Sequence, residues 1–368
     1  MITHGWWAVA AALSAMLGVG AMPPVAQWRI AGEGRGTPAV GGSRVYFLTV
    51  HHEVVAASLR GGGEVWRQST GEPGIETLGS LVVLCGRVVV AGDHAIHGFD
   101  VVTGARRWRF SPRDDEGAGG YVGEEEGGVV FVGSRAGRLY AIDAATGQLR
   151  WSVLVSAAPD TTVFQPIVDK DLVLAGFTTF GRLQSGGLVA IDRVSGRVRW
   201  THPITGEDGP GGFAGGPVVT GVAVVAASGD GRLRAVTRQS GELLWELPGV
   251  VRADGRRQER DWRALAQDGS TLVAGSLSGV ITAYDVRTRR ERWRFVLPDG
   301  GSVALRLTME RGTVYVPHLG GRLVALSAAN GHQRWEIGGL SDGFSWAPAI
   351  AGDVAYAAAR AGLFALPR

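Results

Sequence analysis

The chain has 368 residues and a formal net charge of +3, and because Lys170 is its one lysine, arginine supplies nearly all the positive charge. These arginines are scattered along the chain, which does not favour a nucleic-acid-binding protein. The one cysteine, Cys85, excludes an intrachain disulfide. Glycine is abundant, at 58 residues, and this indicates many tight turns.

The N-terminus contains an apolar run from Trp6 to Met22 without a charged side chain. The small residues Val19 and Ala21 suit cleavage by signal peptidase after Ala21. We therefore expect residues 1–22 to be a signal peptide, with an uncleaved membrane anchor as the alternative. Residues 23–368 are expected to form one domain. Both interpretations predict an extracytoplasmic protein, either periplasmic or secreted.

Eight tryptophans recur along the rest of the chain at intervals of 38 to 49 residues. They are Trp28, Trp66, Trp108, Trp151, Trp200, Trp245, Trp293 and Trp335. One four-stranded blade of a β-propeller takes about 40 to 50 residues. The spacing therefore predicts one blade for each tryptophan.

Seven of these tryptophans end a similar segment, which has a small residue ten positions before the tryptophan and usually a glycine four before it. In AIDAATGQLRW, from Ala141 to Trp151, apolar residues flank a short turn that contains Asp and Gly. This pattern is typical of a β-hairpin. One unit has Arg289 in place of the glycine. We predict that each tryptophan lies on the outermost strand, where its indole docks between adjoining blades.

Trp28 differs from the other seven because no hairpin precedes it. The last repeat ends at Trp335 and is followed by a segment that closes with GLFALPR. We expect Val25 to Ile30 to pair beside Leu363 to Leu366 and to complete the last blade. The predicted fold is all-β: an eight-bladed β-propeller of four-stranded antiparallel blades, whose ring is closed by the N-terminal strand. We expect a monomer.

The segment GRLYAIDAATGQLRW, from Gly137 to Trp151, resembles the repeat of the pyrroloquinoline-quinone (PQQ)-like propellers, and the resemblance covers about residues 25–368. One branch of these proteins is the quinoprotein alcohol dehydrogenases. The other is cofactor-free and includes the lipoprotein that helps to assemble outer-membrane β-barrels. The resemblance therefore implies either a redox enzyme or a binding scaffold.

The enzymatic branch implies PQQ, a calcium ion held by Glu and Asn, a catalytic Asp and a disulfide between adjacent cysteines. This chain has one cysteine, and its one asparagine, Asn330, falls in a repeated hairpin turn. The cofactor-free lipoprotein is anchored through a cysteine after its signal, where this chain has Met22. We expect no cofactor, no metal and no catalytic residue, and hence a non-enzymatic scaffold for an envelope or secreted protein or a small ligand. A PQQ-dependent dehydrogenase, and a sensor or adhesion module, are the alternatives.

The segments that lead into the innermost strands of a propeller converge at its central mouth. By register against the repeat, these segments carry Tyr121, Phe164, Gln165, Phe213, Trp262, Arg263, Arg306, Phe344 and Trp346. Aromatic rings with a few polar groups suit a concave binding site. We predict that these residues bind the partner or ligand. The alternative is that the rings only plug the channel.

Two further groups of residues look reactive without forming a predicted site. The pairs His51 with His52 and His94 with His97 are one or three residues apart, so on strands they point to opposite faces. We therefore predict no metal site at either pair. Cys85, within SLVVLCGRVVV, is expected to be a small buried residue of an inner strand.

Overall fold

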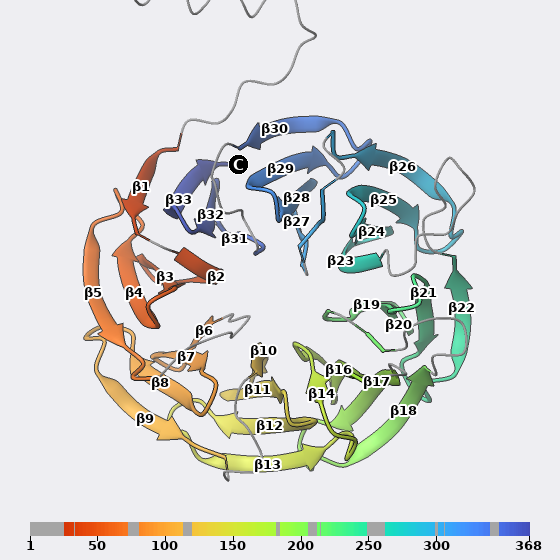
Figure 1. Ribbon diagram of the computed structural model, residues 1–368, viewed down its shortest axis with the longest axis horizontal. Coiled ribbons are helices and arrows are strands. Elements are labelled where there is room, and N and C mark those ends of the chain that lie inside the picture. The colour runs from red at the N-terminus through yellow and green to blue at the C-terminus, as the bar shows by residue number, and fades with distance from the viewer. Residues whose placement is uncertain are drawn as a thin grey trace, which may run out of the picture.

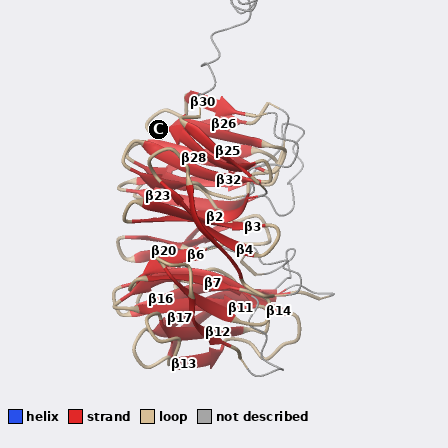
Figure 2. Cartoon of the chain, turned by 90° about the vertical axis from the view of Figure 1, so that its left-hand side faces the viewer, coloured by secondary structure: helices blue, strands red, loops and turns tan. Residues whose placement is uncertain are grey.

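The computed structural model describes residues 26–32, 34–72, 81–112, 120–181, 185–204, 212–213, 215–248, 262–298, 301–304, 306–338 and 346–368, with the backbone alone for 124–126. The described residues form 33 strands and no helix, arranged as eight antiparallel sheets around one axis (Figure 1). Seen from the side, the strands cross the thickness of a disc (Figure 2). The predicted all-β, eight-bladed propeller is confirmed.

In blades 1 to 7 the strands follow chain order from the axis outward. Blades 1 to 3 consist of β2 (Gly34–Gly41), β3 (Arg44–Thr49), β4 (Glu53–Ser58) and β5 (Glu64–Ser69); β6 (Leu81–Leu84), β7 (Arg87–Ala91), β8 (Ile96–Asp100) and β9 (Arg106–Phe110); and β10 (Gly120–Glu126), β11 (Val129–Ser134), β12 (Arg138–Asp143) and β13 (Leu149–Leu154). In blade 4 two short strands share the innermost position, β14 (Thr161–Val163) and β15 (Ile167–Asp169), followed by β16 (Leu172–Thr179), β17 (Ser185–Asp192) and β18 (Val198–Ile204).

Blades 5 to 7 repeat the four-stranded pattern. They consist of β19 (Val218–Thr220), β20 (Ala223–Ala227), β21 (Leu233–Thr237) and β22 (Leu243–Leu247); β23 (Trp262–Asp268), β24 (Thr271–Ser276), β25 (Val280–Asp285) and β26 (Glu291–Val296); and β27 (Thr308–Glu310), β28 (Thr313–His318), β29 (Arg322–Ser327) and β30 (Gln333–Ile337). Blade 8 consists of β31 (Ala349–Ala351), β32 (Val354–Ala359), β33 (Gly362–Pro367) and β1 (Trp28–Ala31).

The antiparallel order of the strands gives the disc two distinct faces. The turns after the first and third strands of each blade lie on one face, which we call the turn face. The turns after the second strands lie on the other face together with the linkers between blades, and we call this the mouth face. Candidate residues can therefore be assigned to a face from their position in the repeat.

The ring closes as the sequence predicts. Strand β1 pairs antiparallel with β33, and Trp28 lies opposite Ala365 while Ile30 lies opposite Leu363. The backbone N–H of Gln27 also donates to the carbonyl of Ala365, at 2.8 Å. Val25 lies outside the described residues. The two ends of the chain thus share one blade.

The tryptophans also have the predicted register on the outermost strands. Each lies opposite the small residue of the neighbouring strand, in the pairs Ala56–Trp66, Gly98–Trp108, Ala141–Trp151, Ala190–Trp200, Ala235–Trp245, Ala283–Trp293 and Ala325–Trp335. At each of these seven pairs the outermost strand has a β-bulge, which places one extra residue directly before the tryptophan. A small residue in this place leaves the indole room to turn toward the next blade.

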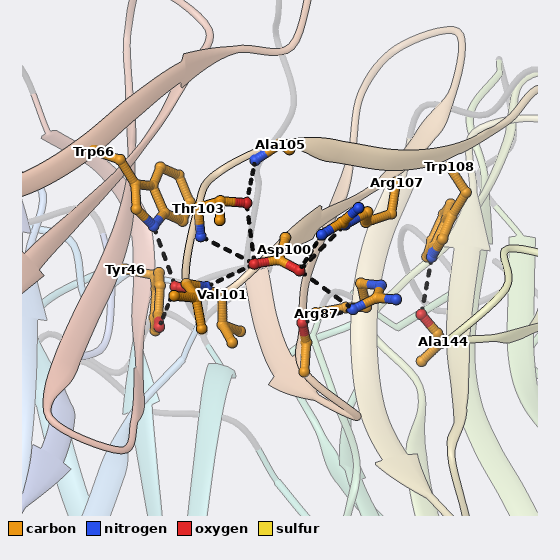
Figure 3. A network of polar contacts seen from close by, with 12 residues as sticks. Tyr46, Trp66, Arg87, Asp100, Val101, Thr103, Ala105, Arg107, Trp108 and Ala144 are labelled. Atoms are coloured by element: carbon orange, nitrogen blue, oxygen red, sulfur yellow. Dashed lines mark hydrogen bonds and ion pairs between the residues drawn. The ribbon is translucent and has the colours of Figure 1, made fainter.

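Hydrogen bonds from the indoles join one blade to the next. Trp66 Nε1 donates to the carbonyl of Val101 in blade 2 at 3.1 Å, and Trp108 Nε1 donates to the carbonyl of Ala144 in blade 3 at 2.9 Å (Figure 3). Equivalent bonds lead from Trp28, Trp151, Trp200 and Trp293 to Leu59, Arg193, Arg238 and Ala328. Six of the eight tryptophans therefore pack against the adjacent blade and also donate a hydrogen bond to it. We call the packed interface between two adjacent blades a seam.

Two physical constraints favour glycine at the turn position of the repeat. Gly147 has a φ of 76°, which favours a residue without a Cβ. A Cβ built on it would also lie 2.6 Å from the indole of Trp108, in the preceding blade. This turn position therefore favours glycine because of its backbone conformation and because the indole of Trp108 leaves no room for a Cβ. Where Arg289 replaces the glycine, with a φ of 60°, the preceding Trp245 makes no indole hydrogen bond within the described part of the chain.

The hydrophobic core is divided among the seams. One cluster joins Ile96 and Trp108 of blade 2 to Val130, Val132 and Tyr140 of blade 3. Burying an indole removes roughly 150–250 Å² from water, which at about 25 cal/mol per Å² stabilises each seam by at most about 4–6 kcal/mol. Each blade is thus held mainly by its two neighbours.

Cys85 does not lie where the sequence suggested. It is exposed, and with Gly86 it forms the turn between β6 and β7, where φ is 47° and 70°. Two consecutive positive φ values are typical of a type I′ hairpin. The expectation of a buried strand residue was wrong because β6 ends at Leu84. In the part of the chain that the structure describes, no helix has the length and apolar character needed to cross a membrane.

Candidate functional site

A cavity of about 570 Å³ occupies the centre of the ring. Its wall comes from the innermost strands and the segments before them, and includes residues of blade 1 and of blades 3 to 8. The wall residues are Thr37, Tyr121, Phe164, Gln165, Ile167, Val168, Asp169, Gly215, Gly216, Pro217, Val218, Val219, Leu265, Ala266, Gln267, Arg306, Leu307, Thr308, Met309, Trp346 and Pro348. The wall thus mixes aromatic, aliphatic and polar groups.

Five of the nine predicted mouth residues lie on this wall: Tyr121, Phe164, Gln165, Arg306 and Trp346. The rings of Tyr121 and Phe164 are tilted against each other with centroids 5.3 Å apart. Gln165 donates from Nε2 to the carbonyl of Val122 at 3.0 Å, which ties blade 4 to blade 3 beside the cavity. These side chains come from blades 3, 4, 7 and 8, so the ring brings together residues that are far apart in the chain.

Two predicted residues are buried in the packing between blades and are absent from the wall. Phe213 is 0% exposed and packs in the cluster around Leu174 and Leu188. Trp262 is 3% exposed, and its ring meets that of Tyr284 edge-on at 6.2 Å. Both side chains pack between neighbouring blades, because Phe213 forms a β-bridge with Ser228 of blade 5 and Trp262 is already the first residue of β23. This corrects their assignment to the mouth.

The remaining two predicted residues have different positions. Arg263 is half-buried, is not a wall residue, and its charge acts on the hydroxyl of Tyr121. Phe344 lies outside the described residues.

The hydroxyl of Tyr121 stays protonated at neutral pH. Burial raises the pKa of Tyr121 to about 12, while the charges of Arg135 and Arg263 act in the opposite direction. The phenol is therefore a neutral hydrogen-bonding group beside the cavity.

Asp169 lies at the other end of the cavity, since it is the last residue of β15 before the turn face. Arg238 donates from Nε to its Oδ2, and from Nη2 to its carbonyl at 2.9 Å. The same Nη2 donates to Asp171 Oδ1 at 2.8 Å. The carboxylate of Asp169 is thus neutralised by the next blade.

Several wall residues escaped the sequence reasoning, among them Asp169, Gln267 and Met309. The predicted residues all lie in or next to the segments that lead into the inner strands, whereas the strands themselves also line the cavity. Alternation along the strand does not mark these residues, because three consecutive residues line the cavity in both Ile167–Asp169 and Leu265–Gln267.

A buried pair between blades 1 and 2 was also missed. His97 Nε2 lies 3.0 Å from Glu72 Oε1, and the backbone N–H of His94 donates to Glu72 Oε2 at 3.0 Å. Burial lowers the pKa of His97, and the hydrogen bond to Glu72 opposes this. Glu72 lies 25 residues before His97 in the sequence. The spacing of the histidines therefore does not indicate the contact between Glu72 and His97.

The described wall does not present the calcium ligands that the enzymatic alternative implies. Asn330 lies in the turn between β29 and β30, where its Oδ1 accepts the N–H of His332 at 3.1 Å. Asp169 is the one acidic side chain on the described wall, and Arg238 neutralises it. Among the described residues no group of three or more His, Cys, Asp or Glu side chains could hold a metal ion. The Glu and Asn ligands that the resemblance implies therefore do not meet at the cavity.

The chain matches the family of the outer membrane protein assembly factor BamB over residues 23–163, 96–277 and 277–366. This chain belongs to the BamB family. The BamB of Burkholderia pseudomallei is 26% identical over 298 residues, which cover 80% of this chain and 71% of that protein. The BamB of Yersinia pestis is 26% identical over 267 residues, covering 68% of this chain and 64% of that protein.

Solved structures show that this fold serves more than one kind of protein. BamB from Moraxella catarrhalis superposes with a TM-score of 0.61 at 19% identity, covering 84% of this chain and 89% of that one. A europium-containing methanol dehydrogenase superposes with a TM-score of 0.74 at 14% identity, covering 90% of this chain and 84% of that one. At such identities the likeness to solved structures concerns the fold alone and does not distinguish an enzyme from a scaffold.

Proposed function

We propose that this chain is an exported, non-enzymatic scaffold that holds a protein partner in the cell envelope. The observation that carries this proposal is the match to the BamB family, which extends from residue 23 to residue 366. Relatives in this family are named for outer-membrane protein assembly. The described wall of the cavity supports the same conclusion, since its residues do not form a catalytic or metal-binding set.

The location in the envelope rests on residues 1–22, which lie outside the described residues. We propose that their apolar run directs export, either as a cleaved signal or as an anchor. Strand β1 follows a few residues later, at Trp28. The export segment is therefore joined to the strand that closes the ring.

The mouth face is the proposed contact surface for the partner. Trp346 is partly exposed on the cavity wall, with Tyr121, Phe164 and Arg306 around the same cavity. Tryptophan, tyrosine and arginine are the residue types that most often dominate the energy of protein interfaces. A group of the partner that enters the cavity from the mouth face would meet Trp346 and Arg306, which are both partly exposed on its wall.

A pull-down from the envelope fraction tests this proposal. The full chain is expected to retain an envelope protein, and Trp346→Ala should reduce the retained amount at least tenfold, since the loss of an aromatic anchor costs about 2 kcal/mol or more. Val194→Ala is the matched control, because Val194 is 81% exposed in a turn on the opposite face. Circular dichroism and thermal unfolding verify that each variant is folded.

Two results would overturn the proposal. One is the same partner recovery with Trp346→Ala as with the unmodified chain. The other is alcohol oxidation by the purified chain after the addition of PQQ and calcium, because that activity belongs to the enzymatic alternative.

A further inference from the structure

We propose that the turn face of the ring binds the anionic surface of a phospholipid membrane. This inference goes beyond the proposed function, because it concerns the opposite face of the disc and a different class of partner. It follows from the charge of the turns, from the backbone conformation of three basic residues in them, and from the place where the N-terminal part of the chain joins the ring.

The turns of the turn face carry an excess of positive charge. All of these turns lie within the described residues, and together they contain nine Lys or Arg residues and three Asp or Glu residues. Blades 4 and 6 alone supply five exposed basic residues, which are Lys170, Arg197, Arg287, Arg289 and Arg290. Exposed charges of one sign on one face attract a surface of the opposite charge.

The acidic residues near these turns do not cancel the excess. Asp171 accepts from Arg238 at 2.8 Å, and Asp353 lies 3.9 Å from Arg311. The Asp residues that end four of the third strands are each paired with an arginine seven positions later. Four first strands end in an acid, and two second strands begin with an arginine; these residues are Glu126, Asp169, Asp268, Glu310, Arg44 and Arg87. The turn face therefore keeps a net positive charge.

Three of the basic residues occupy turn positions where the backbone favours glycine. Lys170, Arg289 and Arg311 have φ values of 56°, 60° and 44°. Six other outer hairpins have glycine at the position of Arg289, and five of the other six blades have glycine at the position of Lys170 and Arg311. A left-handed φ is unfavourable for a residue with a Cβ, and residues in such conformations are concentrated at functional sites. A contact made by this face explains these three residues better than the turns do.

Exposed apolar side chains lie on the same face. Val102 and Val222 are 62% and 77% exposed in turns of blades 2 and 5. A membrane interface accepts apolar side chains, while its anionic headgroups attract Lys and Arg. Headgroups can also move laterally to meet charges that are spread over several blades. These features favour a membrane over a folded acidic protein, which would need a shape complementary to many separate turns.

The N-terminal part of the chain reaches the ring at this face. Trp28, the first residue of β1, lies opposite Ala365 near the end of β33, and third strands end at the turn face. Residues 1–25 contain no Asp or Glu, so they bring no negative charge to it. Met22, the last residue of the apolar run, precedes Trp28 by six residues, and six residues span at most about 20 Å. If the run stays in the membrane as an anchor, the turn face is the face held close to it.

Vesicle binding by the full chain, purified from the envelope fraction, tests the proposal. One set of vesicles contains phosphatidylcholine alone, and the other contains equal amounts of phosphatidylcholine and phosphatidylglycerol. Flotation measures the bound fraction, and the difference between the two sets isolates the contribution of charge from any insertion of the apolar run. The anionic vesicles should bind at least about tenfold more strongly, since each basic residue near such a surface contributes about fivefold. High salt should remove this preference.

Variants of the chain locate the contact on the turn face. Arg289→Gly introduces the residue that the repeat favours, so the fold should be retained, as circular dichroism and thermal unfolding can verify. It should weaken binding to anionic vesicles about fivefold and leave binding to phosphatidylcholine unchanged. Lys170→Gly should act in the same way from blade 4. Arg360→Gln is the matched control, because Arg360 is exposed in the turn after β32 on the mouth face and its loss changes the net charge equally.

The outcomes distinguish this inference from the proposed function. Equal binding to both sets of vesicles, or equal weakening by Arg289→Gly and Arg360→Gln, would contradict the inference. Retention of an acidic envelope protein by the turn face, without a preference for anionic vesicles, would contradict it as well. If the vesicles show no preference while partner recovery still depends on Trp346, the inference fails and the scaffold function stands. If vesicle binding depends on Arg289 but no envelope protein is retained, the scaffold function fails instead.

Discussion

At the scale of single residues, the tryptophans that occur once in each blade are not equivalent. Trp108 and Trp335 are 9% and 7% exposed and hold the same place in their blades. Trp108 donates its indole hydrogen to Ala144, whereas Trp335 Nε1 is buried with no partner among the described residues. The difference follows from the ring closure, because no hairpin joins β33 to β1 to supply the equivalent acceptor.

This difference predicts unequal costs for the same substitution. Trp108→Phe and Trp335→Phe remove the same part of the side chain, but only Trp108→Phe breaks a hydrogen bond and leaves a carbonyl without its donor. We expect Trp108→Phe to lower the free energy of unfolding by about 0.5–1.5 kcal/mol more than Trp335→Phe. Urea denaturation of both variants measures this. Equal losses would show that the indole hydrogen bonds contribute nothing to the seams.

At the scale of the element, the outer hairpins of four blades share an Asp and an Arg seven residues apart. In blade 2, Asp100 Oδ1 accepts the backbone N–H of Val102 and Thr103 at 3.0 and 2.9 Å, and Arg107 donates to Oδ2 at 3.0 Å (Figure 3). The pairs Asp143–Arg150, Asp192–Arg199 and Asp285–Arg292 repeat this contact. The bulge before each tryptophan directs the arginine toward the turn.

These contacts predict an acid-sensitive contribution to stability. The Thr103 backbone hydrogen bond, and then Arg107, hold the pKa of Asp100 below its ordinary range. A lowered folded pKa means that the stabilisation is complete above the unfolded pKa of about 3.9 and is lost as the pH falls through the folded pKa. Asp100→Asn should therefore lower the melting temperature at pH 7, and the difference from the unmodified chain should shrink below pH 3. Thermal unfolding at pH 7, 4 and 2 measures it.

The control for this prediction is Asp268→Asn, because Asp268 is an exposed residue at the end of β23. This variant should differ little from the unmodified chain at any pH. If the difference for Asp100→Asn stayed constant between pH 7 and 2, the carboxylate would not be the source of its effect.

Elements also show where sequence reasoning succeeds and where it fails. The outer hairpins were predictable because the small residue, the turn glycine and the tryptophan recur together. All three are needed for the packing of indoles between adjacent blades. The inner strands were less predictable, since β14, β15, β19, β27 and β31 each have three residues and follow linkers of unequal length. Alternation cannot set a register over so short a strand. Phe213, which precedes the three-residue β19, was therefore assigned to the mouth, although its side chain packs between blades 4 and 5. Trp262 was misassigned for a different reason, because it is already the first residue of the seven-residue β23 and packs between blades 5 and 6.

At the scale of the whole molecule, the cavity depends on the ring being closed. Its wall combines residues from blade 1 and from blades 3 to 8, and no blade could build it alone. Closure in turn depends on four residues, Trp28–Ala31, which complete blade 8. Trp28 also donates to the carbonyl of Leu59 at 3.2 Å and thereby docks blade 8 on blade 1. The central claim is thus that β1 is an integral strand of the ring.

Hydrogen exchange of the native protein, followed by mass spectrometry, tests this claim most directly. The reference is β30 (Gln333–Ile337), another outermost strand, which is continuous with its own blade. If β1 closes the ring, its amides that bond to β33 should exchange as slowly as those of β30 that bond to β29, because both open only when a blade opens. Exchange of the β1 amides at the rate of a free peptide, with β30 still protected, would contradict the closed ring and with it the proposed site.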